Sequence, residues 1–467
     1  MIERLYNEDI IIGRATPPGP SAIAVIRVSG KNCWKILKNI FISRNKKFES
    51  HNAYFGKLLI NPEIMDQVII ITYAKNKSYT GEESFEINCH GSEVLVSLII
   101  ELLISKGARI AEPGEFSKRA FLNGKINLTE AEAIMDLVYS STKNSSLIAV
   151  RQLSGNITNE INKIKNEISN LLAEVEVNID YPEEDLTLNS EQWIKKINKI
   201  NDIFNSLLKG FTRGHFFREG IHTAILGKTN SGKSTLFNFL LNKDKAIVSD
   251  IHGTTRDYLD GIINIKGFGV RIYDTAGLRE SSDPIEAEGT KRALELSKKV
   301  NIIIYILSAE EGFTIKDENN INDIIKINNN IIIIINKIDL IKNKQLNDII
   351  MTIKNYLKKI NKDYKIIKMS ALNKIGIDVF NEAFIEQLIG KNINETEDPI
   401  ITNSRHADLL QKAKNNLQLS VKKINEELLD LAAFEIRESL DRLGEITGEV
   451  TRNDIINKIF SNFCVGK

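Results

Sequence analysis

The chain has 467 residues and a mass of 52.7 kDa, which is too long for a single hydrophobic core, so we expect several domains. Its composition, with 42% hydrophobic and 26% charged residues, is typical of a soluble globular protein and excludes a largely disordered chain. The 62 Lys and Arg residues balance 61 Asp and Glu residues to a formal net charge of +1, which excludes a uniformly basic nucleic-acid-binding chain, so any RNA contact must be local.

The cysteines and the chain start indicate the compartment. Cys33, Cys89 and Cys464 are scattered without the spacing of a disulfide framework or a zinc site. The first residues lack the pattern of a signal peptide, and their acidic side chains disfavour a transit peptide. The most apolar run, which begins at Asn330, is too short to span a bilayer. We therefore expect a cytoplasmic protein without a membrane span.

Residues 1–120 alternate short β-rich runs with helix-like runs. The β-rich runs include AIAVIRVSG, QVIIITYA and SFEINCHG, and EVLVSLIIELLISKG is typical of a helix. We expect an N-terminal α+β domain over this range.

The remainder of the chain divides into two helical stretches around an α/β stretch. Apolar residues recur with a period of 3.6 within residues 121–216 and again within 391–467, where Thr451 and Asp454 would form the capping box of a final helix. Residues 217–390 alternate helices with apolar strands, which is typical of a doubly wound parallel sheet. The simplest arrangement inserts this α/β domain into one discontinuous helical domain, so the fold class is α/β multidomain.

The stretch GKTNSGKS, Gly227–Ser234, matches the phosphate-binding loop pattern G-x-x-x-x-G-K-[ST] between a predicted strand and a predicted helix. The backbone N-H groups of such a loop surround phosphates, Lys233 neutralises the outer phosphates and the Ser234 hydroxyl ligates Mg²⁺. A chance glycine-rich turn is the alternative, and the downstream motifs argue against it.

Those motifs follow in the order of a GTPase. DTAG, Asp274–Gly277, supplies an acid for the Mg²⁺ shell and a backbone N-H for the γ-phosphate. NKID, Asn336–Asp339, ends an apolar strand, and the Asp339 carboxylate can accept two hydrogen bonds from guanine that adenine cannot offer. Ser370 and Ala371 would place backbone donors near the guanine oxygen.

SDIHGTTRD, Ser249–Asp257, lies where the switch I segment of a GTPase belongs, and Thr255 is the expected second Mg²⁺ hydroxyl. Leu278 follows DTAG where Ras-like enzymes have a glutamine that orients the attacking water, so another polar group must act. The local candidates are Arg279, Glu280, Asp283 and Glu286. The predicted GTP contacts are Asn230, Ser231, Gly232, Lys233, Ser234, Thr235, Ser249, Asp250, Ile251, His252, Gly253, Thr254, Thr255, Asp274, Thr275, Ala276, Gly277, Asn336, Lys337, Asp339, Ser370, Ala371 and Leu372.

Four further stretches carry a family resemblance. They are, in chain order, ATPPGPSAIAVIRVSG, SYTGEESFEINCHGS, EPGEFSKRAFLNGKINLTEAEAI and the terminal CVGK. With the GTPase motifs they make the chain similar over its whole length to the MnmE (TrmE) family of bacterial tRNA modification GTPases, within the TrmE-Era-EngA-YihA-Septin-like superfamily. The resemblance implies an N-terminal folate-binding-like domain that dimerises, a discontinuous helical domain and an inserted P-loop G domain.

For the G domain, the resemblance implies a potassium-stimulated GTPase that dimerisation activates. It implies a K⁺ site at Asn230, Ser249, Ile251 and Thr254, where a cation could neutralise developing charge as an arginine finger does. It makes Glu286, with Lys233, catalytic, Glu286 orienting water through a second water. For Glu286 the alternative is an exposed acid in the first turn of a helix. The resemblance assigns three further residues to the switch machinery, namely Arg256, Asp257 and Arg279.

For the N-terminal domain, the resemblance implies that a tetrahydrofolate derivative, the 5,10-methylene or the 5-formyl form, binds to Arg27, Glu86, Lys125 and Lys467. A carboxylate suits the N-H edge of the pterin, and cations suit the acidic tail of folate. The alternative is that these are ordinary surface charges. Cys464 is expected to be needed for tRNA modification and dispensable for GTP hydrolysis, the alternative being a buried structural cysteine.

The function that the resemblance implies is a two-component tRNA modification. A homodimer of this chain would join an FAD-dependent MnmG (GidA) partner in a heterotetramer or larger complex. Together they would add a carboxymethylaminomethyl or aminomethyl group to C5 of the wobble uridine of certain tRNAs, with GTP, Mg²⁺, K⁺ and a folate-borne one-carbon unit. The alternative is a regulatory GTPase of ribosome assembly, but such a protein should carry a basic RNA-binding module, which the neutral flanks do not resemble.

Overall fold

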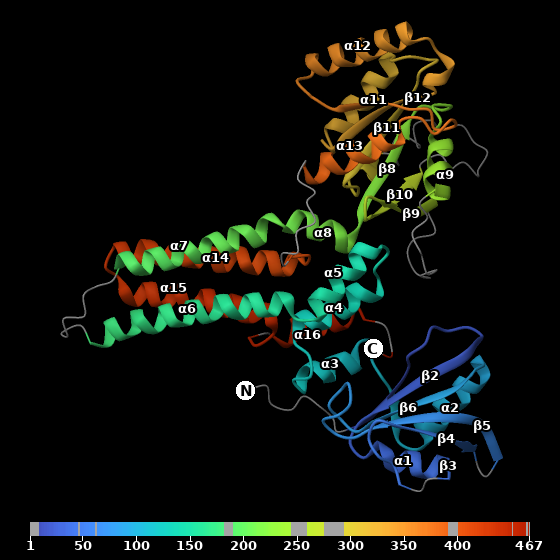
Figure 1. Ribbon diagram of the computed structural model, residues 1–467, viewed down its shortest axis with the longest axis vertical. Helices are drawn as coiled ribbons and strands as arrows, with labels where there is room; N and C mark the ends of the chain where they lie inside the picture. Colours follow the sequence, from blue (N-terminus) through green and yellow to red (C-terminus); the bar gives the residue numbers. More distant parts are fainter. Residues whose placement is uncertain are drawn as a thin grey trace. The chain divides into compact units, whose positions relative to one another are not determined.

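The computed structural model describes residues 9–44, 47–60, 63–181, 190–243, 259–274, 294–390, 400–450, 452–463 and 466 (Figure 1). The chain divides into two compact units, each of more than one segment. Unit 1 comprises Met1–Met135, Leu153–Lys165 and Arg437–Lys467, and unit 2 comprises Asp136–Gln152 and Asn166–Ile436. The domain limits expected after residues 120, 216 and 390 divide the chain differently and stay predictions.

Unit 1 is built on a seven-stranded sheet with the order β3-β4-β5-β6-β2-β1-β7. Neighbouring strands are antiparallel except β1 and β7, which are parallel. The strands are β1 (Ile10–Arg14), β2 (Ser21–Ser29), β3 (Phe41–Ser43), β4 (Asn52–Ile60), β5 (Glu63–Tyr73), β6 (Ser84–Gly91) and β7 (Ala108–Ile110).

One face of this sheet is buried along its length, and the other is open over β3, β4 and β5, where Ile42, Phe55 and Ile69 are exposed. Alternate strand residues such as Ile26, Ile70 and Ile87 are fully buried against the apolar sides of helices α1 (Cys33–Ile40) and α2 (Glu93–Ser105). The intervening residues point to the opposite face, which is why apolar and polar residues alternate along β6, while β2 carries Ile23 and Val25 beside Arg27 on that face. Helices α3 (Glu115–Leu122) and α16 (Asn453–Phe460) also lie within this unit, and α4 (Leu128–Val138) begins in it.

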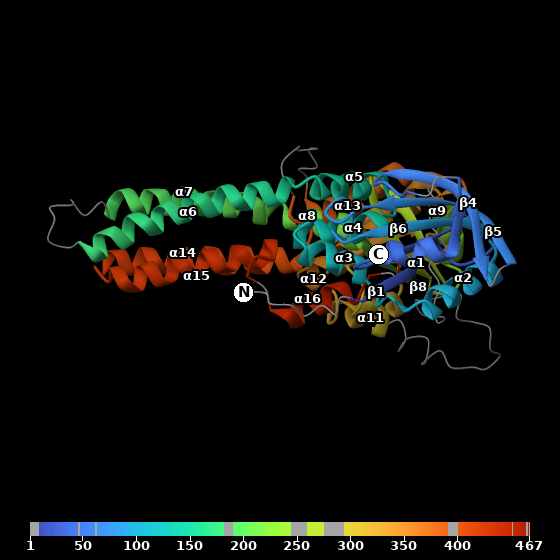
Figure 2. The same ribbon diagram turned by 90° about the horizontal axis from the view of Figure 1, so that it is seen from below.

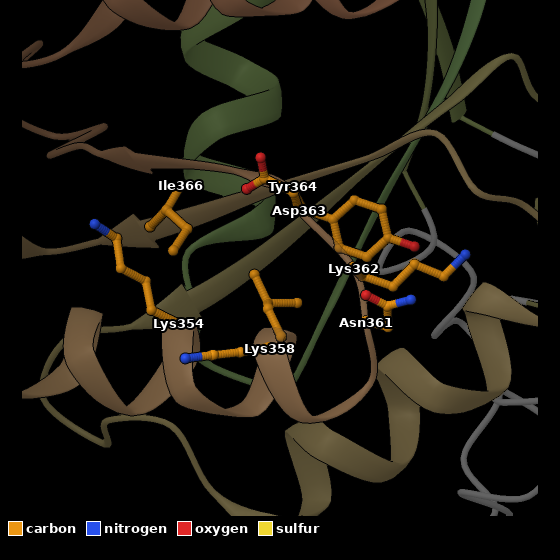
Figure 3. A pocket seen from close by; sticks show the side chains of 8 residues that line it. Lys354, Lys358, Asn361, Lys362, Asp363, Tyr364 and Ile366 are labelled. Carbon is orange, nitrogen blue, oxygen red and sulfur yellow. The ribbon is translucent and has the colours of Figure 1, made fainter.

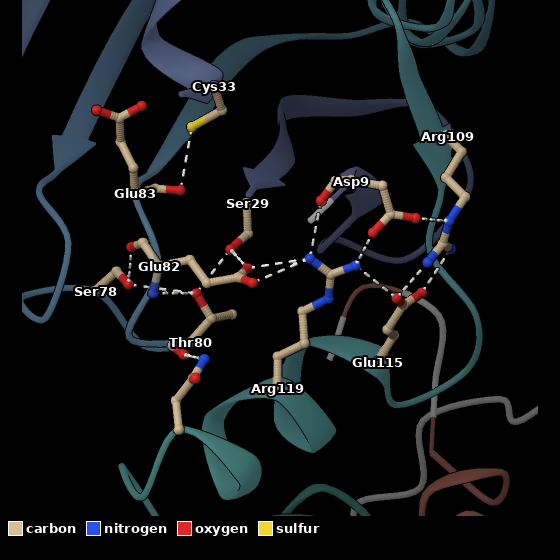
Figure 4. Close-up of polar contacts among 11 residues, drawn as sticks. Asp9, Ser29, Cys33, Ser78, Thr80, Glu82, Glu83, Arg109, Glu115 and Arg119 are labelled. Carbon is tan, nitrogen blue, oxygen red and sulfur yellow. Dashed lines mark hydrogen bonds and ion pairs between the residues drawn. The ribbon is translucent and has the colours of Figure 1, made fainter. Parts of the chain in front are cut away.

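A buried ionic cluster centres on Arg119 of α3, whose side chain is only 1% exposed (Figure 4). Its guanidinium donates to Asp9 Oδ1 at 2.6 Å, to Glu115 Oε1 at 2.9 Å and to both carboxylate oxygens of Glu82 at 3.2 Å. Arg109 adds a second cation, since its Nη2 donates to Glu115 Oε1 at 2.6 Å. The cluster therefore joins the residue before β1, the loop before β6 and the start of α3.

Unit 2 contains a six-stranded sheet with the order β13-β12-β11-β8-β10-β9. Five strands are parallel, and only the edge strand β9 is antiparallel to its neighbour β10. The strands are β8 (Ile221–Gly227), β9 (Leu259–Ile265), β10 (Phe268–Asp274), β11 (Ile302–Ser308), β12 (Ile331–Asn336) and β13 (Lys365–Lys368).

Helices cover both faces of this sheet, as a doubly wound fold requires. The isoleucines of β12 are buried whichever way they point, Ile332 and Ile334 in one core and Ile331, Ile333 and Ile335 in the other. The helical elements after the first strand are α9 (Lys233–Lys243), α11 (Ile315–Ile325), the 3-10 helix η1 (Ile338–Leu340), α12 (Asn343–Lys359) and α13 (Ile377–Ile389).

The helical segments before and after this sheet pack together although they are far apart in sequence. Helix α7 (Ser190–Lys209) runs along α14 (Ser404–Asn425), as Figures 1 and 2 show. The remaining helices are α5 (Lys143–Leu153), α6 (Asn156–Asp180), α8 (Phe211–Glu219) and α15 (Leu429–Thr447). The expected fold class, with a discontinuous helical domain and an inserted α/β domain, is confirmed. Among the described helices, none is long and apolar enough to cross a membrane.

The structure differs from two local expectations. The helical period expected within residues 391–467 is divided into α14 and α15, where Glu427 adopts a left-handed conformation with φ 61°. The last helix begins at Asn453 with Arg452 as its N-cap residue, and no side chain caps it. Thr451 of the expected capping box lies outside the described residues.

We predict that Arg119→Met destabilises unit 1 by about 3–5 kcal/mol, because it removes the buried cation that three carboxylates share and leaves Glu82 without its ion pair. The change can be measured by urea unfolding in a Trp193→Phe background, where Trp34 is the remaining one of two tryptophans and reports on unit 1. Arg442→Met is the control, since Arg442 pairs with Glu438 and Glu445 on one helix and its side chain is 35% exposed. Its loss should cost less than about 1 kcal/mol.

The pH dependence gives a second readout of the same cluster. Burial raises the pKa of Glu115, but hydrogen bonds from Arg109, from the Glu112 N-H and from Arg119 outweigh it and lower the pKa below its usual value of 4.5. A lowered carboxyl pKa stabilises the fold above pH 4.5, and this stabilisation is lost as pH falls through the folded-state pKa. Arg119→Met should lose less stability on acidification than the wild type. Equal acid sensitivity of the two chains would contradict the assignment.

Candidate functional site

The candidate phosphate-binding loop joins the end of β8 to the start of α9 at Lys233. Asn230 and Gly232 have positive φ angles of 64° and 94°, so successive backbone N-H groups line a concave turn that suits an anion. The ammonium of Lys233 donates to the carbonyls of Gly227 at 3.0 Å and Lys228 at 2.5 Å, which holds it within the loop. Ser234 is exposed in the first turn of α9, where its hydroxyl is available to a metal ion.

One buried amide fixes this loop to its neighbours. Asn336, only 2% exposed, donates from Nδ2 to the Ser231 carbonyl at 3.0 Å and accepts at Oδ1 from the Ala371 N-H, also at 3.0 Å. Gly232 is required beside it, because a Cβ there would lie 2.2 Å from Nδ2 of Asn336. Asn336 therefore links the phosphate-binding loop to the loop expected to contact guanine.

The expected guanine contacts lie at the carboxyl ends of β12 and β13. Ser370 and Ala371 are buried, and Ser370 forms reciprocal backbone hydrogen bonds with Ile375 at 3.1 Å that shape the loop. Asp339 is exposed in η1, with its carboxylate open to a base edge, and Leu372 is 76% exposed. Lys337 adopts a left-handed conformation, and its Nζ lies 2.9 Å from Glu310 Oε2.

A lysine in the phosphate-binding loop has a structural partner that the sequence did not indicate. Nζ of Lys228 lies 2.6 Å from Oδ2 of Asp317, a fully buried carboxylate, and also donates to the Thr314 hydroxyl. Asp317 in turn accepts from the Tyr305 hydroxyl at 3.0 Å. The loop is thus bound to the start of α11. The only sequence signal for this ion pair was the lysine itself, at a position where the loop motif accepts any residue.

Several predicted residues cannot be placed. Asp274, the first residue of DTAG, is described by its backbone alone, which pairs with Ile225 of β8, the strand that leads into the phosphate-binding loop. The predicted site residues outside the described part of the chain are Ser249, Asp250, Ile251, His252, Gly253, Thr254, Thr255, Arg256, Asp257, Thr275, Ala276, Gly277, Arg279, Glu286, Cys464 and Lys467.

In unit 1 the structure brings together Arg27 and Glu86, which are directly opposite each other on β2 and β6. Nε and Nη2 of Arg27 each lie 2.9 Å from Oε1 of Glu86. In the described part of the chain, Oε2 of Glu86 accepts no hydrogen bond, so it is available to an N-H edge. The guanidinium also lies 5.7 Å from the ring centroids of Tyr79 and Phe116, which form aromatic walls around the pair.

The end of the chain reaches this pair. The carbonyl of Gly466 accepts from Nη1 of Arg27 at 3.3 Å. Gly466 has φ 97°, and a Cβ there would lie 2.0 Å from the Arg14 carbonyl, so only glycine fits. Lys125, the third expected folate contact described, instead donates to the Asn76 carbonyl at 2.6 Å and is not in contact with Arg27 or Glu86 in the described part.

Cys89 and His90 of the CHG stretch point to opposite faces of the sheet. The Cys89 thiol is buried, donates to the Ala24 carbonyl at 3.5 Å, and has its pKa raised to about 11 by burial and by Asp66. The His90 ring is largely exposed, and its Nδ1 lies 2.7 Å from Asp66 Oδ1. The two side chains therefore cannot ligate one metal ion, and no cluster with three or more metal-ligating side chains occurs in the described residues.

Comparisons with known proteins cover the whole chain. The family model described as MnmE helical domain matches residues 128–464, and that described as GTP-binding protein TrmE N-terminus matches residues 10–125. The tRNA modification GTPase MnmE of Acetivibrio thermocellus is 39% identical over 470 residues, which cover 99% of this chain and 100% of the relative. That of Carboxydothermus hydrogenoformans is 40% identical over 468 residues, which cover 98% of this chain and 100% of the relative.

Among solved structures, a single-substitution variant of Aquifex aeolicus Era bound to GDP and AlF4⁻ is 26% identical to this chain. The match covers 43% of this chain and 67% of the Era chain, with a TM-score of 0.29.

We predict that Asn336→Asp weakens the binding of a fluorescent GDP analogue at least tenfold, or about 1.4 kcal/mol. The aspartate keeps the acceptor for the Ala371 N-H but places a carboxylate against the Ser231 carbonyl. Asn328→Asp is a matched control, because Nδ2 of Asn328 also donates to carbonyls, those of Ser297 and Val300, and Oδ1 accepts a backbone N-H. An equal affinity loss in both variants would show that destabilisation alone explains the effect.

Proposed function

The chain belongs to the MnmE (TrmE) family of tRNA modification GTPases, and we propose that it uses GTP hydrolysis to drive the addition of a carboxymethylaminomethyl or aminomethyl group to C5 of the wobble uridine of certain tRNAs. The observation that carries the proposal is the relationship at 39% identity over 99% of the chain, since it extends through both candidate sites. The chain is then the GTP-hydrolysing component, with an FAD-dependent MnmG (GidA) partner.

The GTPase step rests on the loop geometry. The N-H groups of the loop and the ammonium of Lys233 would hold the phosphates, Ser234 would hold Mg²⁺ with Thr255, and Asp339 would select guanine. Glu286 would orient the attacking water through a second water. Arg256, Asp257 and Arg279 would form the switch machinery.

A potassium ion fits beside the phosphates. The Asn230 side chain is exposed on a left-handed turn at the edge of the loop, so its oxygen can reach a monovalent cation. Ser249, Ile251 and Thr254 would complete the site. A K⁺ ion there would neutralise charge that develops during hydrolysis, which is the role of an arginine finger in other GTPases.

A tetrahydrofolate derivative fits the Arg27 and Glu86 pair. The free Oε2 of Glu86 suits the pterin N-H edge, and Tyr79 and Phe116 offer flat apolar walls. Gly466 brings the chain end to Arg27, which supports roles for Lys467 as a ligand and Cys464 as a residue needed for modification. Lys125 would require a change of partner from Asn76 to join the site.

The open face of unit 1 supports a homodimer. Strand register places Ile42, Phe55 and Ile69 on the same face as Glu86, and these three side chains are 57%, 66% and 46% exposed. Burial of this apolar row against a second copy would remove it from water and cover the candidate folate site. We place the dimer and its MnmG complex in the cytoplasm.

We predict that GTP turnover rises several-fold when K⁺ replaces Na⁺ at equal ionic strength, because Asn230 and switch I would bind the larger ion. Steady-state phosphate release measures this. Asn230→Ala should abolish the difference, whereas the exposed Asn238→Ala on α9 should keep it. Equal wild-type rates in the two salts would refute the potassium site.

We predict that a strain lacking the gene loses the C5 substituent from its wobble uridines, as measured by mass spectrometry of tRNA nucleosides. The wild-type gene should restore it. Glu86→Gln should not, because it removes the carboxylate that would bind the pterin and pairs with Arg27, while purified Glu86→Gln protein should keep normal GTP turnover, because Glu86 does not belong to the nucleotide site. Glu101→Gln, an exposed acid of α2 in the same unit, is the control and should restore the modification.

The alternative function gives a different result in the same strain. Normal wobble nucleosides together with accumulated ribosome precursors would favour a regulatory GTPase of ribosome assembly and would contradict the proposal.

A further inference from the structure

A cavity lies in unit 2 between α12 and the segment that enters β13, and none of the residues that line it belongs to the nucleotide site (Figure 3). Its volume is about 600 Å³. Three lysines line it, Lys354 and Lys358 on α12 and Lys362 in the following turn, around the apolar side chains of Leu357, Tyr364 and Ile366. Neither the GTPase motifs nor the folate residues involve these positions.

The charge around this cavity is concentrated in a chain that is otherwise balanced. Residues 342–368 contain eight lysines and two aspartates, whereas the whole chain has a formal charge of +1. Asp363 at the rim is one of the two acids. A local excess of this size is what a nearly neutral protein needs if it is to bind a polyanion at one place only.

Two of the three cavity lysines have no described partner, whereas the ammonium of Lys362 donates to Asn329 Oδ1 at 2.8 Å. Lys354 and Lys358 are exposed and make no ion pair with any described residue, whereas Lys365 of the same segment is paired with Glu386. The two are four residues apart on α12, so their Cα atoms lie about 6 Å apart along the helix axis on one face. Lys358 in the last turn of α12 is favoured by the helix dipole, but like charges at this spacing repel each other, and an anion between the two lysines would relieve the repulsion.

We propose that this cavity and the exposed face of α12, which we call the α12 basic face (Lys354, Lys358 and Lys362), bind the phosphate backbone of the tRNA substrate. The inference rests on the proposed function, which makes tRNA the substrate. Lysine ammonium groups recognise phosphates as point charges, and Leu357, Tyr364 and Ile366 support their aliphatic stems. Contacts of this kind position an RNA without reading its bases.

The test is tRNA binding by the full-length Lys354→Glu, Lys358→Glu double variant, measured by fluorescence anisotropy with a labelled tRNA over a range of KCl concentrations. We expect at least a tenfold loss of affinity at low salt. The slope of log K against log salt should fall by about 2, one for each phosphate contact removed. Basal GTP turnover should be unchanged, since neither lysine belongs to the nucleotide site.

Two further variants separate a local contact from a general effect of charge or folding. Lys298→Glu, Lys299→Glu makes the same charge change at exposed positions elsewhere in unit 2, and it should keep both affinity and slope close to wild type. Lys354→Gln, Lys358→Gln removes the charges without adding acids and should lower the slope by the same amount. A smaller loss in affinity is expected, because no repulsion is introduced.

The possible results test the tRNA-binding role of the α12 basic face separately from the proposed function on which it rests. Wild-type affinity and slope in the Lys354→Glu, Lys358→Glu variant, beside a wild-type chain that binds tRNA, would overturn the inference and leave the proposed function intact. An equal loss in the Lys298→Glu, Lys299→Glu control would also overturn it. A wild-type chain that binds no tRNA, alone or with its partner, would also overturn the inference, as would binding of an acidic protein to the same lysines in place of tRNA. The wobble nucleosides of the strain lacking the gene test the proposed function separately.

Discussion

The side-chain amide of Asn336 is the constraint on which the nucleotide site depends. Its two ends have opposite hydrogen-bonding character, and each is used: Nδ2 holds the Ser231 carbonyl and Oδ1 holds the Ala371 N-H. Because the amide is buried at the end of the central sheet, the loop that meets phosphates and the loop that meets the base cannot move independently. Binding of the phosphates and binding of the base are therefore coupled.

Elements defined by local pattern were predictable from the sequence. A strand was expected directly before the phosphate-binding loop, where β8 lies, and the isoleucine run after Asn330 is the buried strand β12. A short continuous apolar run is the sequence signal of a buried parallel strand. The break between α14 and α15 was missed, because Glu427 takes a left-handed conformation that a non-glycine residue rarely adopts and that leaves no mark on the apolar period.

Contacts between distant residues were the part that the sequence could not supply. Arg119 and Glu82 belong to two of the sequence motifs that carry the family resemblance. Neither motif indicates that these two side chains form an ion pair. The same holds for Lys228 and Asp317. Lys228 belongs to the phosphate-binding loop, whereas Asp317 lies in α11, for which the sequence indicated no role in the site. Only the opposite placement of Arg27 and Glu86 follows from strand register, and it needed the pairing of β2 with β6 to be known.

The segmented composition of unit 1 has a consequence for biosynthesis. Asp9 near the start of the chain is bound by Arg119, and Gly466 at its end is bound by Arg27, so the unit is closed by residues from both ends. A ribosome makes Arg437–Lys467 after all of unit 2, so unit 1 stays incomplete until these residues have been added. The inserted GTPase is therefore able to fold first, and the contact between Arg27 and Gly466 forms only after it.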